Sequence, residues 1–169
     1  MKTEEFAIQL QEALQQRGYQ NIKSRATEAP GVSMECSFDG VPVQFDLDVG
    51  GKAILRVPVP QPFQLSLSPE STVTRILDEV GQSREVKTGF AQFDENYLVQ
   101  LHPPTFPLFT SDSLPAIAGL EPFIELTGGR SGLEVSKTWE VGSFGPEDAA
   151  RSVDSLLVLF HLAQLAARS

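Results

Sequence analysis

Hydrophobic side chains recur at helical spacing near both ends of the chain. The first pattern predicts a helix over residues 3–17, with Thr3 as its N-cap and Gly18 as its C-terminal cap. The second pattern predicts a longer helix from Pro146 to about Arg168. Its apolar stripe needs a sheet or a partner protein to cover it, so we expect this helix to pack against the rest of the fold.

Between residues 31 and 67 the period of the pattern changes to two. Apolar and polar residues alternate in short runs, and the turn sequences Asp39-Gly40 and Gly50-Gly51 separate them. This pattern predicts an antiparallel meander of three or four strands, with a further strand over residues 63–67. The prolines at positions 58, 60 and 62 each lack a backbone donor, so this stretch lies at a sheet edge or leaves the sheet.

The second half of the chain mixes both periods. We expect a short helix over residues 69–80 with Pro69 in its first turn, and extended backbone over residues 86–101. Residues 112–126 resemble a helix that Ser113 caps and Pro122 interrupts, and residues 133–141 read as one or two strands.

The order of these elements predicts the fold class. Hairpins followed by flanking helices indicate an α+β fold, with a mostly antiparallel sheet flanked by an N-terminal helix and a long C-terminal helix. A chain of 169 residues supports one full-sized core, so we expect a single α+β domain over residues 1–169.

Charge and composition narrow the function classes. The chain has 13 Lys and Arg against 22 Asp and Glu, a net charge of −9, which disfavours nucleic-acid and anionic-membrane partners. The longest apolar stretch, residues 156–167, is broken by His161 and Gln164, so the chain is not expected to span a membrane. The acidic N-terminus is unlike a secretory signal, and the single Cys36 cannot form an internal disulfide, so we expect a cytoplasmic protein.

Few side chains suggest catalysis. Cys36 alternates in register with apolar residues, so we expect it in the core rather than acting as a nucleophile. Asp46 and Asp48 share one strand face and could ligate a divalent cation, although pairing with Lys52 or Arg56 on a solvated face is the commoner outcome. The sequence contains no hydrolase, phosphate-binding or dinucleotide-binding motif. We therefore predict no catalytic residues, no metal and no cofactor.

Three aromatic residues are candidate partner-binding anchors. Phe106 and Phe109 stand among the prolines of the connector over residues 101–109, and stiff loops that carry aromatic rings bind partners at low ordering cost. Trp139 is the third candidate. The alternative for all three is burial in the core, where large apolar groups gain most.

The stretch from Lys87 to Val99 resembles a pattern found in a group of uncharacterised bacterial proteins. Its diagnostic residues are Thr88, Gly89, Phe93 and Asp94, with Tyr97 in the strand that follows. The resemblance covers the layout of residues 86–168, and the chain departs from it at Phe90, where an aspartate is usual. It implies a bacterial origin and no particular activity. Phe93 and Asp94 would then act as an apolar anchor and a side chain that stabilises a turn.

These observations favour a non-enzymatic, cytoplasmic protein-interaction domain of bacterial origin, an adaptor or scaffold that binds a basic or partly apolar protein and can form a homodimer. Two alternatives remain. One is an acidic secretion chaperone, which the chain is similar to in charge, size and layout. The other is a hydrolase that uses carboxylates such as Asp46 and Asp48 with a divalent metal.

Overall fold

The structure, a computed structural model, describes residues 3–26, 31–48, 52–59, 63–69, 87–102, 108–130, 132–138 and 146–167. Four helices and eight strands lie within these ranges: α1 (Thr3–Gln16), β1 (Gln20–Ala26), β2 (Gly31–Phe38), β3 (Val41–Asp48), β4 (Lys52–Val57), β5 (Gln64–Pro69), α3 (Ala91–Asn96), β6 (Tyr97–His102), α4 (Ser113–Ala118), β7 (Glu125–Gly129), β8 (Gly132–Thr138) and α5 (Pro146–Ala167).

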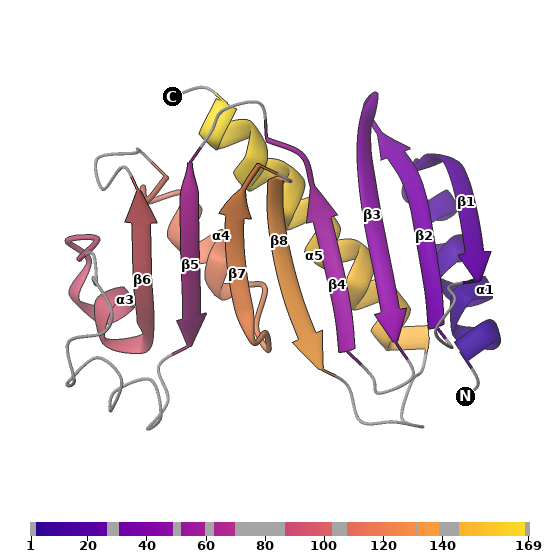
Figure 1. The fold of residues 1–169 in the computed structure, drawn as a ribbon, viewed down its shortest axis with the longest axis horizontal. Coiled ribbons are helices and arrows are strands. Elements are labelled where there is room, and N and C mark those ends of the chain that lie inside the picture. The colour runs from indigo at the N-terminus through magenta and orange to yellow at the C-terminus, as the bar shows by residue number, and fades with distance from the viewer. Residues whose placement is uncertain are drawn as a thin grey trace.

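All eight strands belong to one antiparallel sheet, in the order β1-β2-β3-β4-β8-β7-β5-β6. Helix α5 packs over β4 and β8, and α1 packs beside it over β1 and β2. Figure 1 shows α1, α4 and α5 on the same face of the sheet, with α3 beside the edge strand β6. The expected α+β fold, with helices from both ends of the chain packed together on an antiparallel sheet, is confirmed.

The core lies between the sheet and these helices. Alternate residues of β2 and β3, such as Met34, Cys36 and Phe45, are buried, which confirms that Cys36 points into the core. Helix α5 contributes a buried stripe that includes Leu156 and Phe160. Burying each large apolar side chain of this kind contributes about 1.5–3 kcal/mol, so the alternation and the helical stripe together account for the packing of the two layers.

The hairpin formed by β7 and β8 inserts into the middle of the sheet, between β4 and β5. The helix predicted over residues 112–126 is therefore wrong in its second half, because α4 ends at Ala118 and β7 begins at Glu125. The peptide bond between Glu121 and Pro122 is cis, and the Ile124 N–H donates to the Ser136 carbonyl across the hairpin at 2.8 Å. Residues 125–129 therefore form a strand that pairs with β8, although the spacing of the apolar residues over 112–126 is typical of a helix.

Other predicted elements also need correction. Residues 91–96 form α3 instead of extended backbone, and the polar edge strand β1 was missed. Pro69 closes strand β5 rather than opening a helix, and the rest of the helix expected over residues 69–80 lies outside the described residues. The chain leaves β4 at Val57, directly before Pro58, as the missing backbone donors of that proline-rich stretch predicted.

In the described part of the chain, no helix combines the length and the hydropathy that crossing a membrane requires.

Candidate functional site

A groove of about 750 Å³ lies between α3 and α4, beside the edge strand β6. An apolar groove with a few polar groups is a usual first candidate for a binding site. Among the described residues, Glu121 is the only charged side chain that lines this groove. The full lining comprises Phe90, Gln92, Phe93, Asn96, Tyr97, Ser111, Leu114, Pro115, Ala118 and Glu121.

The turn before α3 is held by one carboxylate. Asp94 accepts hydrogen bonds from the Thr88 N–H at 2.8 Å, the Thr88 hydroxyl at 2.7 Å and the Gly89 N–H at 3.2 Å. Gly89 has a φ of +87°, a conformation that glycine adopts without strain. This arrangement confirms Asp94 as a turn-stabilising side chain. The same turn sets the position of Phe90, which is 41% exposed and lines the groove.

A chain of aromatic rings forms the wall behind α3. The ring centroid of Phe93 lies 4.5 Å from that of Tyr97 and 5.9 Å from that of Phe109. Tyr97 in turn stacks on Phe123 at 6.1 Å, with the two ring planes 5° apart. Phe93 is buried, as expected for an apolar anchor. Because aromatic pairs of this geometry add about 0.5–1.5 kcal/mol each, the wall is expected to be rigid.

Ser113 does not cap α4: the N-cap position is Asp112, whose side chain makes no capping hydrogen bond, and Thr110 holds the turn that leads into the helix. The Thr110 side-chain oxygen accepts hydrogen bonds from the N–H groups of Asp112 and Ser113, at 3.3 and 3.2 Å. Ser113 is the first residue of the helix, and its hydroxyl oxygen accepts the Thr110 N–H at 2.8 Å. Each residue therefore satisfies backbone donors of the other, and the pair fixes the turn from which α4 extends along the groove.

Glu121 and Tyr97 are joined at the groove. The Tyr97 hydroxyl donates a hydrogen bond to Oε1 of Glu121. The pKa of Tyr97 is raised above its usual value, first by burial and then by this bond and the negative charge of Glu121. Tyr97 therefore stays protonated, and its proton is directed at the carboxylate.

The structure places one of the three predicted anchors. Phe109 is half-buried and packs against the core through Phe93, so its ring supports the groove wall and does not line the groove itself. Phe106 and Trp139 lie outside the described residues, and their roles stay predictions. The groove residues Phe90 and Glu121 were missed. Phe90 directly follows the turn of Thr88 and Gly89, and an aromatic side chain at such a turn was the signal that could have identified it.

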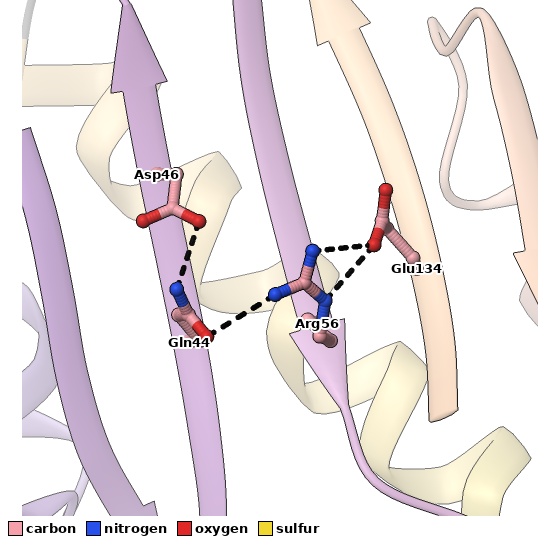
Figure 2. Close-up of polar contacts among 4 residues, drawn as sticks. All are labelled: Gln44, Asp46, Arg56 and Glu134. Carbon is pink, nitrogen blue, oxygen red and sulfur yellow. Dashed lines mark hydrogen bonds and ion pairs between the residues drawn. The ribbon is translucent and has the colours of Figure 1, made fainter. Parts of the chain in front are cut away.

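The face of the sheet opposite α1 and α5 carries the two aspartates considered for metal binding. Asp46 accepts a hydrogen bond from Gln44 at 2.9 Å, and Gln44 accepts one from Arg56 at 3.3 Å (Figure 2). Arg56 also donates two hydrogen bonds to Oε2 of Glu134, at 2.9 and 2.7 Å (Figure 2). Asp48 accepts the backbone N–H of Lys52 at 2.9 Å. Among the described residues, no three potential metal ligands of the His, Cys, Asp and Glu types cluster together.

Cys36 has the environment of a structural thiol. Burial raises its pKa from 9.0 to about 11. At neutral pH this keeps the sulfur protonated, and the thiolate is the form that reacts.

The α3 turn yields a direct stability prediction. Replacing Asp94 by alanine removes three hydrogen bonds from the turn, so we expect the free energy of unfolding to fall by about 1–2 kcal/mol. Replacement of the exposed neighbour Glu95 by alanine is the matched control, and we expect a change below about 0.5 kcal/mol. Urea unfolding followed by circular dichroism measures both. Equal effects would show that Asp94 does not hold the turn.

Comparison with known proteins identifies no relative: no family model, no curated protein and no solved structure matches this chain.

Proposed function

We propose that the protein is a non-enzymatic protein-interaction domain, an adaptor or scaffold of the bacterial cytoplasm, which uses the α3–α4 groove to bind a segment of a partner protein. The segment presents an apolar side chain next to a basic one. The observation that carries the proposal is the groove itself, a largely apolar surface with Glu121 as its only charged lining residue in the described part of the chain.

The apolar half of the proposal rests on exposed surface. Phe90 leaves 41% of its surface exposed, and Leu114, Pro115 and Ala118 of α4 line the opposite side of the groove. An apolar groove bordered by polar groups is typical of sites that take up part of another protein. The hydrogen-bonded turns before α3 and before α4 hold the two walls in place, so binding costs little ordering.

The basic half of the proposal rests on charge. Tyr97 holds one carboxylate oxygen of Glu121, and no cation among the described residues forms an ion pair with this side chain. The net charge of −9 adds a long-range attraction for basic segments. A lysine or arginine beside the apolar residue would pair with the carboxylate and fix the orientation of the bound segment.

The two alternatives, a secretion chaperone and a metal-dependent hydrolase, differ in how they relate to the groove. A secretion chaperone would be a special case of the same binding proposal, in which one partner dominates. The hydrolase alternative has no observation in its favour, because Asp46 and Asp48 already accept hydrogen bonds from Gln44 and Lys52.

A peptide screen tests the proposal. The probes are labelled peptides in which a central leucine or phenylalanine is flanked by lysine or arginine, together with matched peptides that carry glutamate at the flanking positions. We expect the basic peptides to bind and the acidic ones to bind at least about tenfold more weakly, a difference of about 1.4 kcal/mol. Fluorescence anisotropy measures both affinities.

Two variants locate the binding. Phe90→Ser removes apolar surface at the groove, and Ala118→Trp fills the groove, so each is expected to weaken the basic peptides about tenfold or more. Ile8→Ser is the matched control, because Ile8 is 59% exposed on α1, away from the groove. Absence of peptide binding, or an equal loss in Phe90→Ser and Ile8→Ser, would contradict the proposal. Pairing of two copies of this chain without peptide binding would contradict it too.

A further inference from the structure

Lys137 is buried on the helix-covered side of the sheet. It follows Leu133 and Val135 in the inward-facing register of β8 and is 6% exposed. Its Nζ donates hydrogen bonds to the Leu120 carbonyl and to the Ser155 hydroxyl oxygen, both at 2.8 Å. Ser155, on α5, is itself 4% exposed. The amine therefore lies where the end of α4, β8 and α5 meet.

The hydrogen bonds of Nζ match an uncharged amine. A neutral amine has two N–H donors and a lone pair, whereas an ammonium group has three donors. The Leu120 carbonyl and the Ser155 hydroxyl accept two hydrogen bonds, which match the two N–H donors of the neutral amine. The third N–H donor of the ammonium form has no acceptor among the described residues. No described carboxylate forms an ion pair with Lys137. Burial of an amine without a carboxylate partner favours its neutral form, in which the nitrogen lone pair is free.

A cavity of about 210 Å³ adjoins this amine. Lys137 and Ser155 line it together with four charged side chains: Glu121 after α4, and Asp148, Arg151 and Asp154 from α5. This volume is below that of a pocket for a drug-sized ligand, so the cavity suits a small organic molecule of a few heavy atoms. The pKa of Lys137 is lowered from 10.5 to about 8, first by burial and then by the positive charge of Arg151. Burial combined with a cationic neighbour is the environment that activates lysine as a nucleophile.

We propose that Lys137 is a nucleophilic amine that forms an imine with a small aldehyde or ketone entering this cavity. The Nζ lone pair attacks the carbonyl carbon and a C–N bond forms. The carbonyl oxygen then leaves as water, taking both hydrogens of the amine, and a C=N bond remains. No electron transfer is involved, and Ser155 lies within hydrogen-bond reach of the nitrogen to orient it. This reaction takes place in a different cavity from the α3–α4 groove, and Glu121 lines both.

Reductive trapping on the intact protein tests the proposal. The native chain is treated with propanal and cyanoborohydride between pH 7 and pH 10.5, and the modified lysines are quantified by mass spectrometry of peptides. Lys23 and Lys52 are exposed and serve as internal controls in the same sample. Near pH 8 the neutral fraction of Lys137 exceeds that of an ordinary lysine by on the order of 100-fold.

The expected result is that Lys137 is modified at least about fivefold faster than Lys52 at pH 7.5. Its rate should level off above about pH 8.5, while the rates of Lys23 and Lys52 continue to rise toward pH 10.5. In denaturant the three lysines should react alike. If native Lys137 reacts no faster than the two exposed lysines, or if its rate rises with theirs to pH 10.5, the proposal is overturned and Lys137 only connects the elements around it.

Discussion

Replacing Gly132 by alanine is expected to lower the free energy of unfolding by about 4 kcal/mol, the sum of backbone strain and overpacking. Gly132 has a φ of +103°, which side-chain-bearing residues rarely adopt. A Cβ atom there would lie 2.2 Å from the Val57 carbonyl oxygen and 2.6 Å from the Pro58 Cα. These are backbone atoms at the end of β4, so they cannot rotate away as a side chain would. Urea unfolding followed by circular dichroism measures the loss.

Gly129 provides the control for this prediction. It is paired with Gly132 in the register of β7 and β8, but a Cβ at Gly129 would have no atom within 4 Å, and its φ is not positive. Alanine at this position is expected to change the free energy of unfolding by less than about 1 kcal/mol. Similar losses in the two variants would show that β8 does not approach the end of β4 as closely as the structure describes.

Burial of Lys137 predicts a pH-dependent stability. The pKa of Lys137 falls from 10.5 in the unfolded chain to about 8 in the folded one, so between these values the unfolded state binds more protons. Stability contributed by this group therefore rises with pH across that window, by on the order of 3 kcal/mol in total. Below pH 8 the cost of burying the charged amine is fully present. The free energy of unfolding of the native chain relative to a Lys137→Met variant is expected to increase from pH 7.5 to pH 10.5.

Comparing the native chain with the Lys137→Met variant removes the contributions that other titrating groups make to the free energy of unfolding. Cys36 and Tyr19, whose pKa values burial raises to about 11 and about 12, oppose the trend above pH 9 but are common to both proteins. Lys52→Met is the control, because Lys52 is exposed. We expect its difference from the native chain to stay flat over the same range. A flat difference for Lys137→Met as well would show that Lys137 is not buried in the folded state.

The fold was predictable from sequence where one local signal dominated. The alternation in β2 and β3 and the apolar stripe of α5 each bury one face, so period alone identified them. The polar strand β1 lacks such a signal because it lies at the sheet edge. Helix α3 buries only Phe93, and its start depends on bonds from Thr88 and Gly89 to Asp94. The insertion of β7 and β8 between β4 and β5 depends on contacts between distant segments, which no local pattern encodes.

The site was predictable only in part. The turn-stabilising role of Asp94 was predicted, and it follows from ordinary side-chain chemistry. The groove could not be foreseen, because its other wall depends on where α4 ends, and the pairing of β7 with β8 replaces the second half of the helix that the spacing suggested. Lys137 left a usable signal, since its place in register with Leu133 and Val135 puts a charged residue on the apolar face of a strand.

The most direct test of the account maps the bound segment on the protein. Chemical-shift changes of backbone amides are recorded while the tightest basic peptide of the screen is titrated into the native chain. If the segment binds in the α3–α4 groove, the changes cluster in α3 and α4, over residues 90–97 and 111–121. Changes centred on the opposite face of the sheet, around Gln44, Arg56 and Glu134, or no saturable change at all, would contradict binding in the groove.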